Sequence, residues 1–196
     1  MTIESVRSGQ WVRRFRTGPA APSARLICFP HAGGSATFYF PVAKRLPADV
    51  ELLAIQYPGR QDRRGEACVE DIRVLADRVA EKLAELADQP FALFGHSLGA
   101  TVAFETALRL QEERGVSPVR LYASGRRAPS CHREESLHLR DDAHLIEEMK
   151  QMDGTDPQVF ANEEVLRMVL PSFRSDYRAA ETYRYRPGPA LDCPVT

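Results

Sequence analysis

The sequence predicts an α/β fold with a mostly parallel sheet flanked by helices. Two observations carry this prediction: short apolar runs recur along the chain, and segments with helical periodicity lie between them. Runs this short and this apolar suit strands that are covered on both faces, as in a parallel sheet. A length of 196 residues is enough for one compact domain with its own core, so we expect residues 1–196 to form a single domain.

The expected strands follow one another through the first two thirds of the chain. A short edge strand is expected around residues 11–15, ahead of a turn-rich stretch at 18–23. Four apolar runs then predict core strands, at residues 25–29, 50–57, 91–94 and 120–124. Pro30 stops the first run, and Pro58 with Gly59 stops the second. Residues 191–196 resemble the start of one more strand.

Two amphipathic helices are expected between these strands. Residues 71–86 place apolar side chains at three- and four-residue spacing, which puts them on one face: Ile72, Leu75, Val79, Leu83 and Leu86. Residues 98–113 show the same spacing, and Gly115 marks the end of that helix. Alternation of strand and helix is typical of layered α/β folds.

From residue 129 the pattern changes. Residues 130–142 are polar and rich in histidine, and the apolar positions that follow predict a helix ending near Gly154. A second helix is expected over residues 165–173, interrupted or restarted at Pro171, because proline cannot donate the helical hydrogen bond. Two helices with no strand between them suggest an insertion that caps the sheet, over residues 129–189.

Composition narrows the class of protein. Hydrophobic residues make up 43% of the chain and charged residues 27%, as is usual for globular proteins. A net charge of -1 offers no attraction for nucleic acid or an anionic membrane. No stretch approaches the ~20 apolar residues of a membrane span, and residues 1–10 lack the apolar core of a secretory signal. The four cysteines have neither disulfide-framework nor metal-ligand spacing: Cys28, Cys68, Cys131 and Cys193. We therefore expect a cytoplasmic protein with reduced thiols and no metal.

One pentapeptide carries chemistry. It fits the pattern G-x-S-x-G and consists of Gly95, His96, Ser97, Leu98 and Gly99. In a nucleophile elbow the serine lies on a sharp strand-to-helix turn, and the flanking glycines avoid collisions with the chain beside the turn. An expected strand precedes this pentapeptide and an expected helix follows it, as the motif requires. We interpret Ser97 as a nucleophile.

A glycine-rich turn follows the first core strand, with the sequence His31, Ala32, Gly33, Gly34. An oxyanion hole uses backbone N–H groups, so small residues are needed for close approach. The amides of Ala32 and Leu98 are the candidate donors. The alternative is that the two glycines mark a plain loop.

These motifs, with two more, resemble the type II thioesterases, the stand-alone editing enzymes of polyketide and nonribosomal peptide synthases. The resemblance rests on four segments in order: 29–35 (FPHAGGS), 57–60 (YPGR), 95–99 (GHSLG) and 170–177 (LPSFRSDY). It extends from about residue 25 to 196. It implies an α/β-hydrolase fold in which residues 129–189 form a helical lid.

The resemblance also implies the reaction and the partner. An acyl group arrives as a thioester on the phosphopantetheine arm of an acyl or peptidyl carrier protein, and Ser97 accepts it. Water then releases the acid, which edits stalled or aberrant chains without a cofactor. Met149, Met152 and Phe173 could contact the acyl chain, although packing within the lid is the usual fate of such positions.

The chain departs from the family pattern where the serine's partners are concerned. In this fold the acid and then the histidine base follow the serine, and the resemblance places both beyond Thr196. His132, His138 and His144 are expected to be solvated, and neither Asp176 nor Asp192 matches the family's acid. We therefore leave the acid and base unassigned, and expect residues 1–196 alone to be nearly inactive.

Other readings stay open. Two arginine clusters could guide an acidic carrier, although solvated loop charges are the usual explanation of such clusters: Arg60, Arg63 and Arg64, then Arg126 and Arg127.

Two alternative functions also remain. A small-molecule carboxylesterase could use the same fold. The chain could also be a non-catalytic module that binds acyl carriers. This interpretation is disfavoured, because a strained backbone at the elbow costs stability and usually persists only at functional sites.

Overall fold

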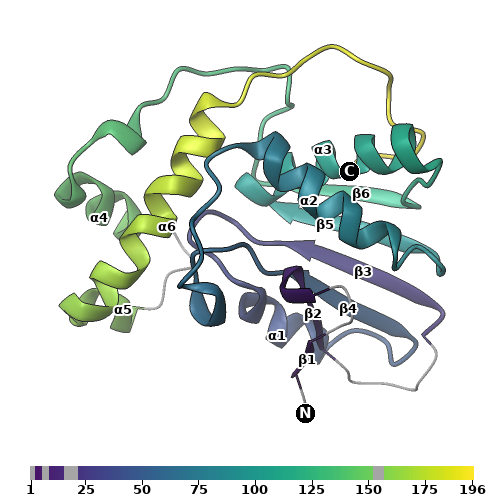
Figure 1. Ribbon diagram of the computed structural model, residues 1–196, viewed down its shortest axis with the longest axis horizontal. Helices are drawn as coiled ribbons and strands as arrows, with labels where there is room; N and C mark the ends of the chain where they lie inside the picture. The colour runs from purple at the N-terminus through teal and green to yellow at the C-terminus, as the bar shows by residue number, and fades with distance from the viewer. Residues whose placement is uncertain (1–2, 6–8, 16–21, 152–156) are drawn as a thin grey trace.

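A computed structural model of the protein describes residues 3–5, 9–15, 22–151 and 157–196. Its six-stranded sheet has the order β1-β2-β4-β3-β5-β6 (Figure 1). The strands are β1 (Ile3–Ser5), β2 (Val12–Phe15), β3 (Ala24–Phe29), β4 (Val50–Ile55), β5 (Phe91–His96) and β6 (Arg120–Ser124). The last four pair in parallel, whereas β1 and β2 are antiparallel to their neighbours. The mostly parallel sheet is confirmed.

The expected strands form with small shifts in their ends. β4 stops at Ile55, before the predicted end at residue 57, and β5 runs two residues further than predicted, to His96. The strand expected around residues 11–15 forms as β2, but it does not lie at the edge, because β1, which was not predicted, pairs with its outer side. The last residues contribute an isolated parallel bridge between Leu121 and Val195.

Side chains on successive residues of the core strands enter two different cores. On β3, Ile27 and Phe29 pack on one side of the sheet and Cys28 on the other. The first core contains α2 (Ile72–Ala84) and α3 (Leu98–Arg114), which pack against each other along that face (Figure 1). The second contains the 3-10 helix η2 (Ala36–Tyr39) and α1 (Phe40–Ala43). Both faces of β3 and β4 are thus covered, as their apolar runs predicted. One face of β5 and β6 is not, because Phe94 is only partly buried and Tyr122 is exposed.

Both predicted helices of the sheet region form, and their ends have recognisable caps. Asp71 accepts hydrogen bonds from the amides of Arg73 and Val74 at the start of α2. Gly115, with φ of 63°, closes α3 in the left-handed conformation. Short 3-10 helices lie at Gly9–Trp11, Gln61–Arg63 and Leu137–Leu139.

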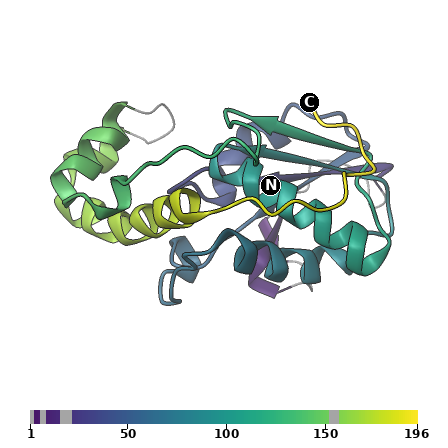
Figure 2. The same ribbon diagram turned by 90° about the horizontal axis from the view of Figure 1, so that it is seen from above.

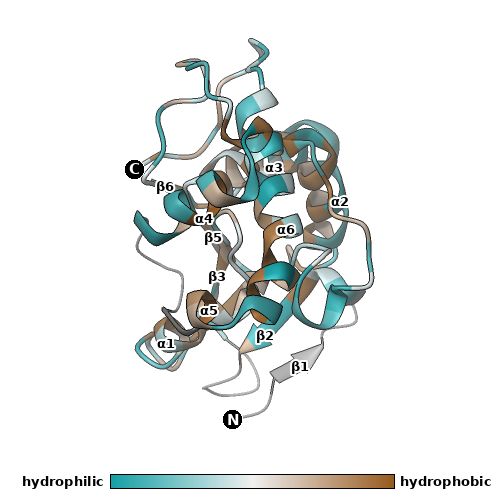
Figure 3. Ribbon diagram, turned by 90° about the vertical axis from the view of Figure 1, so that its left-hand side faces the viewer, coloured by the Kyte–Doolittle hydropathy of each residue, from teal (hydrophilic) through white to brown (hydrophobic). Residues whose placement is uncertain are grey.

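Three further helices, here called the helical segment, lie beside one end of the sheet (Figures 1 and 2). They are α4 (Asp142–Gln151), α5 (Pro157–Ala161) and α6 (Glu163–Thr182). Leu145, Met149, Leu170 and Phe173 form their own small core. Hydrophobic and hydrophilic residues both occur along α4 and α6 in Figure 3, as expected for amphipathic helices.

The predicted interruption at Pro171 is wrong, because α6 runs through it without a break. Pro171 is exposed, and so is Arg167 one turn earlier, whose carbonyl would otherwise accept a hydrogen bond from position 171. Asn162 caps the helix by accepting from the amides of Glu164 and Val165. Burial of other side chains of α6, such as Phe173 and Ala179, outweighs the local penalty of the proline.

Candidate active site

Ser97 lies at the sharp turn between β5 and α3. Its φ of 52° and ψ of -118° belong to a sparsely populated backbone region, and a non-glycine residue held there stores strain. Its own amide donates to the carbonyl of Ser124 at 2.9 Å, which ties the turn to the end of β6. This is the geometry of the nucleophile elbow that the pentapeptide predicts.

The two glycines of the pentapeptide lie where no side chain fits. A Cβ on Gly95 would be 2.2 Å from the carbonyl oxygen of Gly99, and a Cβ on Gly99 would be 2.1 Å from that of Phe29. Both contacts are with backbone, which cannot move aside cheaply. The elbow therefore depends on close packing between its own first helical turn and the end of β3.

Ala32 and Leu98 lie on the same cavity as Ser97, which has a volume of about 440 Å³. Leu98 is the first residue of α3, so its amide is one of the unpaired N–H groups at a helix N-terminus. Among the described residues, neither the amide of Ala32 nor that of Leu98 has a hydrogen-bond partner. Two free donors beside a serine hydroxyl are what an oxyanion hole requires.

The rings of His31 and of His96, the residue before Ser97, lie close together. The His96 ring bonds Ser124 Oγ through Nδ1 at 3.0 Å, and its ring centroid lies 6.1 Å from that of His31. Burial, and secondarily the nearby His96, lower the pKa of His31 below its ordinary value. His31 is therefore neutral at pH 7.

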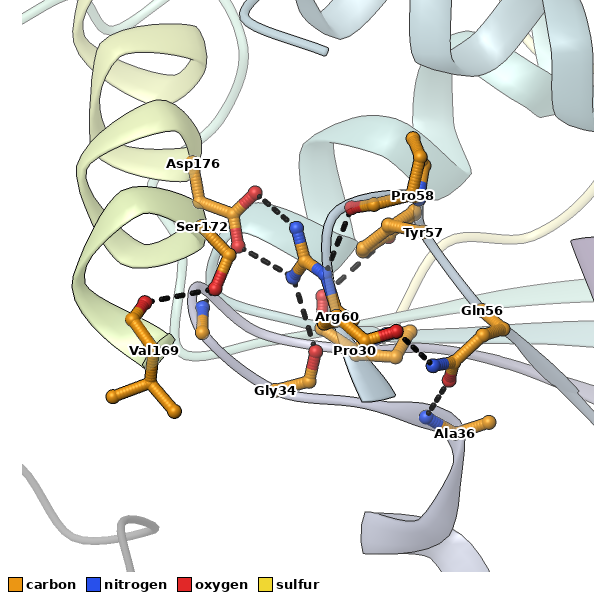
Figure 4. A network of polar contacts seen from close by, with 11 residues as sticks. Pro30, Gly34, Ala36, Gln56, Tyr57, Pro58, Arg60, Val169, Ser172 and Asp176 are labelled. Atoms are coloured by element: carbon orange, nitrogen blue, oxygen red, sulfur yellow. Dashed lines mark hydrogen bonds and ion pairs between the residues drawn. The ribbon is translucent and has the colours of Figure 1, made fainter. Parts of the chain in front are cut away.

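The loop that carries Ala32 is held by a buried ion pair (Figure 4). Gly34 donates to the carbonyl of His31 at 2.9 Å, which closes residues 31–34 into a turn, the 31–34 loop. The amide of Gly33 donates to Asp176 Oδ2 at 2.8 Å. Asp176 is also paired with Arg60 through both carboxylate oxygens, at 2.7 and 2.9 Å. Arg60 in turn donates to the carbonyl of Gly34 at 3.1 Å.

This ion pair was missed in the sequence. Arg60 was grouped with solvated loop charges, which is wrong, because it is 6% exposed. Burial disfavours its charged form, but the charge and hydrogen bonds of Asp176 outweigh burial and raise the pKa of Arg60. Arg63 is likewise buried, since it donates to the carbonyl of Gln56 and pairs with Glu66. Arg60 and Asp176 lie in two of the segments that resemble the family, 57–60 and 170–177, but the sequence does not show that these two residues pair.

Charged side chains dominate the rim of the Ser97 cavity. The helical segment and the loops on either side of it contribute Arg126, Arg127, Glu135, Arg140, Glu148, Tyr177 and Glu181. Burial, and secondarily Arg127, lower the pKa of Arg126, which donates to the carbonyl of Ala180 at 3.2 Å. The second arginine cluster therefore lies beside the candidate nucleophile.

The residues suggested for acyl contact lie elsewhere. Met149 and Phe173 are buried in the core of the helical segment and line a different cavity, of about 510 Å³, on the side of the 31–34 loop that holds His31 and Phe38. Neither lines the cavity of Ser97. Met152 is outside the described residues.

The expectation that all three histidines of residues 130–144 are solvated is wrong for His138. Its side chain is 13% exposed and contacts Glu181, which also accepts the amides of Leu137 and His138. His132 and His144 are exposed. In the described part of the chain, the hydroxyl of Ser97 has no hydrogen-bond partner, so the structure assigns no base.

The part of the chain that the structure describes contains neither a metal-ligand cluster nor a membrane-spanning helix. No group of three or more His, Cys, Asp and Glu side chains is placed to hold a metal ion there. No helix in those parts of the chain is long and apolar enough to cross a membrane.

A mostly parallel sheet with a serine at the turn between a strand and the following helix is the arrangement of the α/β-hydrolase fold. Residues 24–194 match the thioesterase domain family. The chain is 50% identical over its whole length to the probable cadicidin biosynthesis thioesterase of Streptomyces griseus, and 48% identical over 97% of its length to thioesterase PikA5 of Streptomyces venezuelae. It spans 54% and 68% of those relatives.

Solved structures of thioesterases have the same fold as this chain. The type II thioesterase BorB of the borrelidin cluster superposes with a TM-score of 0.87 at 52% identity, covering 97% of this chain and 78% of BorB. YbtT, a type II thioesterase of the yersiniabactin pathway, has a TM-score of 0.81 at 34% identity, covering 94% and 77%. The chain belongs to the thioesterase family, in its type II branch.

Proposed function

We propose that the protein hydrolyses acyl thioesters from the phosphopantetheine arm of carrier proteins, as an editing enzyme of polyketide or nonribosomal peptide biosynthesis. The observation that carries this proposal is the strained elbow of Ser97 beside the two unpartnered amides of Ala32 and Leu98. The relatives of this chain support the substrate class, because they are named as thioesterases of such pathways.

The chemistry follows from this geometry. Ser97 Oγ attacks the thioester carbonyl and forms the carbon–oxygen bond of a tetrahedral intermediate. The amides of Ala32 and Leu98 hold the oxyanion, assisted by the N-terminus of α3. The carbon–sulfur bond breaks, the departing thiolate takes up the proton that left the Ser97 hydroxyl, and the acyl group remains on Ser97 as an ester. Water then attacks this ester and releases the acid.

The remaining parts of the proposal concern the acid, the base and the lid. The base that takes the hydroxyl proton, and the acid that orients it, are assigned beyond Thr196, as the order of these residues in the family implies. Residues 129–189 act as a lid, since they supply much of the rim of the Ser97 cavity. Arg126 and Arg127 lie on this rim and are the proposed contact for an acidic carrier, an effect that salt would screen.

The test uses the full-length protein with acetyl-, propionyl- and longer acyl-carrier proteins, and follows release of the acid by mass spectrometry. We expect turnover, and we expect Ser97→Ala to lower it by about 10⁶-fold, the scale seen when a nucleophilic serine is removed. Faster hydrolysis of free esters than of carrier thioesters would instead indicate a carboxylesterase. No turnover, and no labelling of Ser97 by a fluorophosphonate, would indicate a non-catalytic module.

A further inference from the structure

The buried pair of Arg60 and Asp176 joins three distant segments of the chain. Arg60 follows β4, Asp176 lies on α6, and the two glycines that they contact belong to the 31–34 loop after β3. Arg60 and Asp176 are 6% and 1% exposed. In Figure 4 the guanidinium lies between the carboxylate on α6 and the loop carbonyls.

Stability alone does not explain this pair. Taking two charges out of water costs about as much as their attraction returns, and well-packed apolar residues often serve as well. What an apolar pair could not supply is direction. Arg60 donates to the carbonyls of Pro58 and Gly34, while Asp176 accepts from the amide of Gly33. These bonds fix the peptide planes immediately after Ala32.

α6 holds the same loop by a second contact. Phe173 lies one helical turn before Asp176, on the same face, and packs on Gly33 so closely that a Cβ there would be 2.7 Å from its Cδ2. Gly33 has φ of 72°, which glycine adopts without strain. The helix therefore places an anion and an aromatic ring on the residue that follows Ala32.

We propose that Arg60 and Asp176 are positioning residues, which hold the 31–34 loop so that the amide of Ala32 points into the Ser97 cavity. The proposal rests on the proposed function, because it assigns Ala32 to the oxyanion hole. It also makes the oxyanion hole depend on the position of α6. Movement of α6 away from the sheet would release Gly33 and disorganise that donor.

The test compares variants in full-length protein with one acyl-carrier substrate. Asp176→Asn retains the volume and one acceptor but removes the charge, and it should lower kcat about tenfold with KM within threefold. The double variant Arg60→Met with Asp176→Leu removes both charges together. Because it also leaves the amide of Gly33 and the carbonyl of Gly34 without these partners, its urea midpoint should fall moderately. Its kcat should be lowered on the order of 100-fold, as expected for loss of one oxyanion donor.

Glu51→Gln is the matched control. Glu51 also belongs to a buried ion-pair cluster, with Arg14 and Arg25, but this cluster lies at the first residues of β3 and β4, the other end of the strands from Ser97. The Glu51→Gln substitution should leave the kcat of the folded protein within about twofold of wild type. A double variant whose kcat is within threefold of wild type would overturn the proposal. If that variant does not fold, Asp176→Asn decides, and a kcat equal to that of Glu51→Gln would overturn it.

Failure of this inference differs from failure of the proposed function. If wild-type protein releases no acid from any carrier, the function is wrong. If wild type is active, Ser97→Ala is inactive and the double variant retains its kcat, only the positioning role is wrong.

Discussion

The sheet region and the helical segment are stabilised in different ways. In the sheet region, one large apolar core joins β3, β4 and β5 to α2 and α3, and residues such as Leu53 and Leu93 are fully buried. Among the described residues, the helical segment has a separate core of four buried side chains. It meets the sheet region through Ala179 of α6, which belongs to the larger apolar core, and through directed polar contacts such as the Asp176–Arg60 pair.

This difference separates stability from position. Apolar burial is non-directional and proportional to area, so it holds the sheet region together without depending on any one angle. Hydrogen bonds and ion pairs contribute less net free energy but require a defined geometry. We infer that the sheet region supplies most of the free energy of folding, whereas the contacts of α6 set how the 31–34 loop is presented to Ser97.

The largest expected effect tests the close packing of the sheet region. Gly99→Ala would place a Cβ 2.1 Å from the carbonyl of Phe29, so we expect it to lower the free energy of unfolding by at least about 3 kcal/mol in urea titrations. Gly65→Ala is the control, because a Cβ there meets nothing within 4 Å. Equal unfolding midpoints for the two variants would contradict the close packing.

A pair of truncations compares the two cores directly. Leu93→Ala should lower the global free energy of unfolding by about 2 to 5 kcal/mol. Leu145 is equally buried, but in the smaller core. Leu145→Ala should therefore shift global unfolding by only about 1 kcal/mol while hydrogen exchange in α4 accelerates, because the helical segment can open locally. Equal global losses would show that the two regions unfold as one unit.

Pro171 tests whether local preference limits α6. Pro171→Ala restores a helical N–H and removes a poor helix former, so it should stabilise α6 by about 1 to 3 kcal/mol. Hydrogen exchange of α6 amides should slow accordingly, with little change in the sheet region. Met168→Ala, at another exposed position of the same helix, should not slow it. Unchanged exchange in Pro171→Ala would mean that packing already sets the stability of α6.

The smallest effect concerns pH. Burial and then His96 lower the pKa of His31, so the folded protein binds a proton there less readily than the unfolded chain. The stability associated with neutral His31 is thus fully present above about pH 6.5 and is lost as pH falls through the lowered pKa, by at most ~1.4 kcal/mol per pH unit. Unfolding at pH 7.5 and 5.0 should show less acid sensitivity in His31→Gln. The exposed control His132→Gln should behave as wild type.

The sequence by itself determined the features that depend on near neighbours. Apolar runs predicted β3 to β6, helical spacing predicted α2 and α3, and the glycines around Ser97 predicted the elbow, because each depends on contacts between residues a few positions apart or on burial that residue type records. Motif order identified the family for the same reason. None of these required knowledge of how distant segments meet.

Only the tertiary structure decided the rest. Arg60 and Asp176 are 116 positions apart, and nothing local in a surface-like arginine or a mid-helix aspartate distinguishes a solvated charge from a buried partner. The continuity of α6 through Pro171 and the burial of His138 against Glu181 have the same origin. In each case the outcome depends on contacts with a remote segment, which the residues nearby in the sequence do not record.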